Sequence, residues 1–165
     1  MGKKIILLII VLSIIVTLTC FMPFPTRINM TIAGIRWVNN DGEFTENVEL
    51  EIKGLYLQYL FQDNVFVGDI SFTGLNRDIY SEMMKITFNE EPNFSGPLAY
   101  YSRTSNSITW LGDIHIEGAF DKIVIYLSRE DKDGYSDCYI SAPASDRQAA
   151  VDTASRLYGD GWVFT

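Results

Sequence analysis

The sequence predicts a mainly β (α+β) protein, an antiparallel sandwich or strongly bent sheet of about seven or eight strands. One C-terminal helix and one N-terminal transmembrane helix complete the predicted fold. Three observations support it. Short runs of alternating apolar and polar residues fill most of the chain, as in strands with one face in water. Turn residues separate these runs at short intervals, which favours antiparallel pairing. An uncharged, apolar stretch follows a short basic tip at the start, and a helical pattern lies near the end.

The N-terminal stretch has the pattern of a membrane segment. Residues 1–4 form a tip with two lysines, and Ile5 to Met22 contains no charged residue before Pro23. As a helix it would be about 27 Å long, close to the hydrocarbon core of about 30 Å. The positive-inside rule places residues 1–4 in the cytoplasm. We therefore expect a single-pass cell-membrane protein, with Ile5 to Met22 (residues 5–22) as its anchor or uncleaved signal and the C-terminal domain outside.

Two other fates of this segment stay open. A cleaved signal peptide would leave a secreted domain, but its apolar core is usually roughly 7–15 residues long, shorter than here. A lipoprotein would be lipidated at Cys20. Thr17 and Thr19, however, occupy positions where a lipobox has Leu and a small residue. The retained anchor is the simplest interpretation, and the lipoprotein is the second.

Residues 23–27 are expected to be a linker, and residues 28–165 a single extracellular β-rich domain. Arg27 to Val38 is rich in Ile, Thr and Trp, and Asn39 to Gly42 suits a hairpin turn. Val48 to Ile52 alternates in polarity, and the alternation changes phase at Gly54, which indicates a bulge or bend. The strands expected after this point lie at residues 67–73, 84–88, 98–101, 108–118, 123–127 and 138–140.

A helix is predicted at about residues 145–158. Ser145 and Gln148 match the capping box S-x-x-Q. Apolar residues repeat at helical spacing as far as Tyr158, and Gly159 supplies a C-terminal stop. Residues 162–164 then form either a short last strand or a packed tail.

One phrase occurs twice, as VGDISFTG at residues 67–74 and LGDIHIEG at residues 111–118. It describes either a piece of construction, a strand that bends at one glycine and ends at another, or a two-fold site with Asp69 and Asp113 as paired carboxylates. Seven positions of common residue types are weak support for a site. We therefore favour the first interpretation.

Candidate chemistry is concentrated at Asp113, His115 and Glu117. These alternate residues project from one face of a strand, about 7 Å apart, and His115 is the sole histidine of the chain. They could bind a metal if other elements supplied converging ligands, or His115 could act as the base of a hydrolase. A solvated strand face explains the same pattern. We therefore predict no catalytic residue, cofactor or metal, and keep these three residues as candidates.

Composition narrows the classes of partner. The net charge of −8 argues against nucleic acid, which requires a basic surface. Cys20 lies in the anchor and Cys138 in the domain, so no internal disulfide is expected. An exported domain without disulfides favours a bacterial source.

Two stretches, IKGLYLQYLFQDNVFVGDISFTG and ISAPASDRQAAV, resemble small exported or membrane-anchored proteins of Gram-positive bacteria. The resemblance implies an anchored extracellular domain and carries no catalytic residue. We expect a non-enzymatic binding or accessory protein of the bacterial cell envelope, with a protein or cell-wall partner. The alternatives are an envelope hydrolase or metal-dependent enzyme using Asp113, His115 and Glu117, and a structural subunit of a membrane complex.

Overall fold

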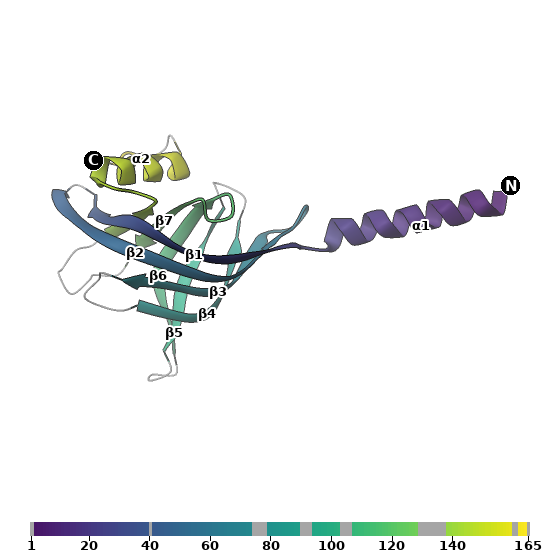
Figure 1. The fold of residues 1–165 in the computed structure, drawn as a ribbon, viewed down its shortest axis with the longest axis horizontal. Coiled ribbons are helices and arrows are strands. Elements are labelled where there is room, and N and C mark those ends of the chain that lie inside the picture. The colour runs from purple at the N-terminus through teal and green to yellow at the C-terminus, as the bar shows by residue number, and fades with distance from the viewer. Residues whose placement is uncertain are drawn as a thin grey trace.

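The fold was taken from a computed structural model, which describes residues 2–39, 41–73, 79–89, 94–102, 107–128, 138–159 and 162–164. In these residues eight strands lie between two helices (Figure 1). In chain order the elements are α1 (Gly2–Phe21), β1 (Phe24–Val38), β2 (Asp41–Gln58), β3 (Asn64–Thr73), β4 (Ile79–Phe88), β5 (Ser95–Ser102), β6 (Ser107–Glu117), β7 (Lys122–Leu127), β8 (Cys138–Ala142) and α2 (Arg147–Tyr158).

The strands form one antiparallel sheet in the order β4-β3-β2-β1-β8-β7-β6-β5. The sheet bends until its two edge strands meet, which gives a nearly closed barrel (Figure 1). At the seam Asn89 N–H donates to the Ser95 carbonyl at 2.9 Å, and Ser95 N–H donates back at 3.2 Å. The mainly β, antiparallel prediction is thus confirmed, and the single continuous sheet matches its strongly bent alternative.

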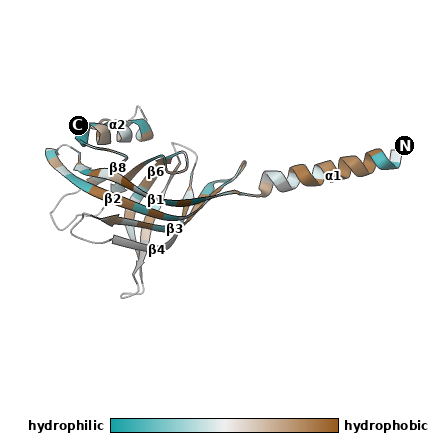
Figure 2. Ribbon diagram, in the orientation of Figure 1, coloured by the Kyte–Doolittle hydropathy of each residue, from teal (hydrophilic) through white to brown (hydrophobic). Residues whose placement is uncertain are grey.

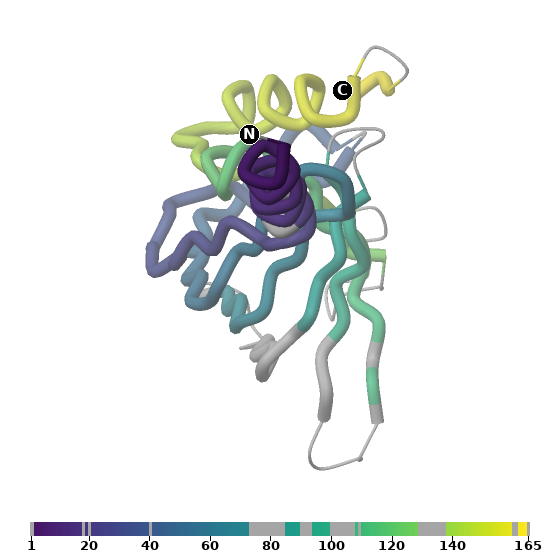
Figure 3. The backbone as a smooth tube through the Cα atoms, turned by 90° about the vertical axis from the view of Figure 1, so that its right-hand side faces the viewer, coloured from purple at the N-terminus to yellow at the C-terminus, as the bar shows by residue number. Residues whose placement is uncertain are grey.

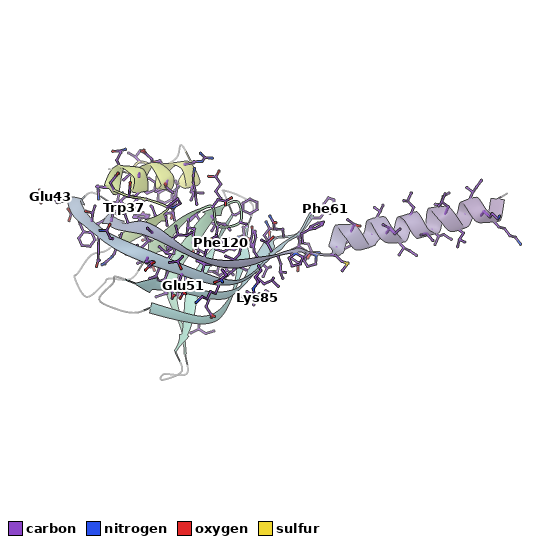
Figure 4. The ribbon with its side chains drawn as sticks, in the orientation of Figure 1. Trp37, Glu43, Glu51, Phe61, Lys85 and Phe120 are labelled. Atoms are coloured by element: carbon purple, nitrogen blue, oxygen red, sulfur yellow. The ribbon has the colours of Figure 1, made fainter. Side chains whose placement is uncertain are left out.

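The interior of the barrel is filled with side chains from the inward positions of the strands. Phe120 enters this core from the turn between β6 and β7 (Figure 4). Its ring lies 4.9 Å from that of Phe66 and 5.7 Å from that of Tyr56, centroid to centroid. The largest fully buried side chains of this core are Tyr56, Phe66, Phe72, Phe88, Phe120, Leu50, Ile52, Ile70, Ile86 and Leu98. The barrel is therefore a packed core.

The repeated phrase marks two bent strands. Register shifts occur beside Gly68 in the β3–β4 pair and opposite Gly112 in the β5–β6 pair. A Cβ at Gly68 would clash with the carbonyl oxygen of Lys53, so only glycine allows this approach of the backbones. Asp69 and Asp113 lie on strands that are not neighbours in the sheet. The construction interpretation is therefore supported over the paired-carboxylate interpretation; Gly74 lies outside the described residues.

α2 packs against the outer face of β1, β6, β7 and β8 (Figure 3). Its apolar side forms a second cluster of buried side chains with the strands. The cluster consists of Ala150, Ala154 and Leu157 from α2 and of Ile35, Trp37, Val124 and Tyr139 from the strands. The N-cap differs from the prediction. Asp146, one residue after Ser145, accepts the Ala149 N–H at 2.9 Å, because a carboxylate is a stronger acceptor than a hydroxyl at this position. Gly159 ends the helix with φ 77°, as predicted.

α1 extends away from the barrel and is coloured hydrophobic along much of its length (Figure 2). The side chains from Ile5 to Leu12 are all exposed. Across the residues that the structure describes, however, no helix has both the length and the hydropathy that a membrane crossing requires. The structure therefore does not support the expected transmembrane span over residues 5–22. β1 already begins at Phe24, inside the expected linker of residues 23–27, because it pairs with the end of β2.

Candidate functional site

A row of outward-facing side chains crosses four neighbouring strands. Asp113 of β6 lies opposite Tyr126 of β7, Tyr126 opposite Tyr139 of β8, and Tyr139 opposite Trp37 of β1. Because side chains alternate between the faces of a strand, directly paired residues point to the same side of the sheet. His115, two residues after Asp113, faces the same way. The sheet thus presents three aromatic rings and one carboxylate in line.

α2 and the tail that follows it cover this row. The ring of Tyr158, the last residue of α2, lies 4.2 Å from that of His115 and 6.2 Å from that of Tyr139. The centroid of the Trp162 ring lies 5.1 Å from that of the Tyr158 ring. Residues 162–164 thus form a packed tail, the second of the two predicted alternatives, since Phe164 contacts Trp37 and Tyr139 edge-on.

A hollow of about 430 Å³ remains between the row and its cover. This volume lies in the range of about 300–1,000 Å³ typical of small-molecule sites. We call this hollow the aromatic pocket. The described residues that line it are Asn39, Asp113, His115, Tyr126, Tyr139, Tyr158 and Trp162. It therefore combines aromatic walls with a few polar groups, as ligand sites commonly do.

The electrostatics of the aromatic pocket are dominated by Asp113. Burial raises the pKa of the Asp113 carboxyl above its ordinary value, because a partly desolvated carboxylate is less stable. The pKa of the Tyr158 hydroxyl is also raised, chiefly by burial and further by the neighbouring Tyr139 and Asp113. The described lining of the pocket contains one carboxylate and no lysine or arginine.

The structure brings two of the three candidate residues to the aromatic pocket and holds the third elsewhere. Asp113 and His115 both line the aromatic pocket, but Glu117 does not. Arg156 of α2 donates to Glu117 Oε1 at 2.5 Å, and Lys122 Nζ lies 3.5 Å from Glu117 Oε2. Within the described ranges no three His, Cys, Asp or Glu side chains gather where they could hold a metal ion. The solvated strand face is also wrong for His115, which is only 9% exposed because α2 covers it.

The Glu117–Arg156 pair predicts a pH effect. The hydrogen bond from Arg156 lowers the pKa of Glu117 below its ordinary value of 4.5. A lowered pKa stabilises the fold above that value, and the contribution is lost as pH falls through the lowered pKa. The Glu117→Gln variant should therefore be less stable than the parent at about pH 7, by a margin that shrinks at about pH 3. Denaturant unfolding of both chains measures this margin, with exposed Glu43→Gln as the control; an equal margin at both pH values would contradict the pairing.

The sequence prediction missed most of the aromatic pocket. It treated Tyr158 as part of the apolar side of the helix, and it placed Trp162 only in a last strand or packed tail. The detectable signal was that Asp113, Tyr126 and Tyr139 occupy outward positions of consecutive strands. The side chain of Cys20 lies outside what the structure describes, so its lipidation stays an untested alternative to the retained anchor.

Cys138 of β8 is buried, at 1% exposure. Arg36, a residue distant in sequence, donates from Nε to Cys138 Sγ at 3.0 Å and from Nη1 to Glu46 at 3.1 Å. The thiol is therefore part of a buried polar contact, without access for a substrate.

Comparison of the chain with protein families, curated proteins and solved structures found no match. The resemblance to exported Gram-positive proteins therefore stays a prediction.

Proposed function

We propose that this chain is a non-enzymatic binding protein of the bacterial cell envelope, attached to the membrane through α1, with the aromatic pocket as its ligand site. One observation carries the proposal: a ligand-sized hollow is walled by rings from β7, β8, α2 and the tail, with Asp113 and His115 beside them. Its ligand is a small molecule, or an exposed group of a cell-wall or protein partner.

The position of the pocket supports binding at the surface. The interior of the barrel is filled by the core cluster, so a ligand has to bind outside it. Other hollows of about 490 Å³ and 330 Å³ exist, the first over β1, β2 and β3 beside Gly54, the second between the β1–β2 hairpin and the start of α2. Neither is lined by an aromatic side chain among the described residues. Aromatic walls favour the pocket under α2, because rings supply large contact areas in ligand sites.

The exposed apolar side chains of α1 support attachment to a membrane. An uncovered apolar surface of this size is costly in water and marks a contact with lipid or protein. The apolar surface continues onto the barrel near the junction, where Phe24 is 49% and Phe61 is 73% exposed, and Phe61 lies toward α1 (Figure 4). Lys3 and Lys4 precede the apolar residues, the charge order of segments that direct export. The proposal requires attachment by α1, on the extracytoplasmic side.

The enzyme alternative has less support. Glu117 is held by Arg156 and Lys122, and no third acidic or cysteine ligand joins Asp113 and His115 within the described part of the chain. A hydrolase would need a nucleophile or an activated water held beside His115. Among the described lining residues the hydroxyls belong to tyrosines, which are weak nucleophiles at neutral pH.

Attachment through α1 is tested by placing charges in it. The Ile9→Asp, Leu12→Asp double variant should move from the membrane fraction to the soluble fraction, because a carboxylate in lipid costs several kcal/mol. Fractionation of bacterial cells measures the distribution, and protease added outside the cells reports the side of the barrel. Ile108→Asp, at a 77% exposed position on β6, is the control and should stay with the membrane. A parent chain found in the soluble fraction would contradict the attachment.

A further inference from the structure

We propose that the aromatic pocket binds an organic cation with an alkylated ammonium group, with Asp113 as its counter-charge. Tyr126, Tyr139, Tyr158 and Trp162 would surround the cation. The inference rests on the proposed function, since it names the ligand class of the same pocket. A quaternary ammonium has no N–H donors, so aromatic faces and one carboxylate can replace its water.

The orientation of the rings favours a compact cation over a flat ligand. The Tyr126 and Tyr139 rings are tilted by 42°, and the Tyr139 and Tyr158 rings by 80°. Trp162 stands at 65° to Tyr158. Because the rings are inclined to one another, they face the aromatic pocket from several directions. This arrangement suits a rounded alkylammonium group. A flat sugar ring would stack best on one open aromatic face.

The charge of the pocket selects the sign of the ligand. Asp113 is the one carboxylate among the described lining residues, and none of these is a lysine or arginine. Its partial burial weakens the screening of its charge by water, and its influence reaches the Tyr158 hydroxyl. This carboxylate would attract a cation and repel an anion. The net charge of −8 also attracts cations over a longer range.

The same aromatic row already holds a cation at its other end. The guanidinium carbon of Arg147 lies 5.5 Å from the ring centroid of Trp37, within the range of a cation–π interaction. Trp37 stacks on Tyr139 at 4.8 Å, and Tyr139 lines the pocket. The chain therefore supplies its own cation at the Trp37 end, whereas the Asp113 end opens into the hollow.

The test is calorimetric titration of the full chain in a maltoside detergent, which carries no ammonium group. Choline is the first probe, and 3,3-dimethyl-1-butanol is its neutral counterpart of the same shape. Choline should bind at least about tenfold more tightly than the neutral alcohol, because only choline gains the ring and carboxylate electrostatics. Glycerophosphocholine is the third probe. Its binding relative to choline distinguishes a lipid headgroup from a free cation as the source of the ammonium group.

Two variants locate the binding. Asp113→Asn keeps the shape and removes the charge, and Trp162→Ala removes a wall that is 55% exposed and so of little consequence for folding. Each should weaken choline binding by about tenfold or more. Asp69→Asn is the matched control, because Asp69 occupies the same place in the other copy of the repeated phrase and lies outside the pocket. It should leave choline binding unchanged.

The outcomes separate the ligand class from the binding function. Absence of choline binding, or equal binding of the neutral alcohol, overturns the cation inference. If a cell-wall glycan then binds and Trp162→Ala abolishes that binding, the pocket remains the ligand site and only its ligand class is wrong. If choline binds equally to the parent, Asp113→Asn and Trp162→Ala, the pocket is not its site and the inference fails.

Discussion

Replacing Phe120 by alanine is expected to lower the free energy of unfolding by about 3–5 kcal/mol, the usual cost of removing a fully buried phenylalanine. Phe120 is fully buried although it belongs to a turn. Its ring meets Tyr56, Phe66 and Phe88 edge-on at 4.9–6.0 Å. The neighbouring turn residues, Gly118, Ala119 and Asp121, are small or polar. We therefore expect the cavity left by alanine to persist.

Denaturant unfolding of the full chain in detergent, followed by circular dichroism, measures this loss. Phe61→Ala removes the same atoms from a 73% exposed position and serves as the matched control. It should change the free energy of unfolding by less than about 0.5 kcal/mol. A Phe120→Ala chain as stable as Phe61→Ala would show that the turn does not anchor the barrel core.

The Gly112→Ala variant is expected to lose about 2–5 kcal/mol, the combined range for backbone strain and overpacking. Gly112 has φ 153°, which L side chains rarely adopt, and a Cβ there would clash with the carbonyl oxygen of Tyr126. Because Gly112 pairs with Leu127 and precedes Asp113, relief of the clash has to displace β6 from β7. We therefore expect both lower stability and weaker ligand binding.

Unfolding midpoints and choline titrations of the same preparation measure both effects. Gly42→Ala is the control, since a Cβ at Gly42 meets no atom within 4 Å. Equal stability of the Gly112→Ala and Gly42→Ala chains would contradict the proposed role of the glycine in the repeated phrase.

Much of the fold was predictable because local patterns determine it. Alternation and turn residues identified the strands, and the position of Gly159 identified the end of α2. Closure of the sheet was not predictable, since it depends on the meeting of β4 and β5 and on a hydrogen-bonded bridge between Asn89 and Ser95. Phe120 was also missed, because an apolar turn residue has no periodic signal to show that it points inward.

The aromatic pocket was less predictable than the fold. Strand alternation correctly placed Asp113 and His115 on one face of the sheet, and both residues line the pocket. Tyr158 and Trp162 also line it, but their position depends on how α2 crosses the outer face of the sheet. Glu117 was a false candidate, because Arg156 is 39 residues away in sequence and its proximity appears only in three dimensions.

The three tryptophan indoles of the chain can report directly on the proposed ligand site. Trp162 lines the aromatic pocket, Trp37 is buried beside it, and Trp110 is 54% exposed on β6 and does not line it. A nitrogen–proton NMR titration of the full chain in maltoside with choline follows each indole N–H separately. We predict that the Trp162 signal shifts and saturates while the Trp110 signal stays fixed. A fixed Trp162 signal, or a saturating shift at Trp110 alone, would contradict the claim that this pocket is the ligand site.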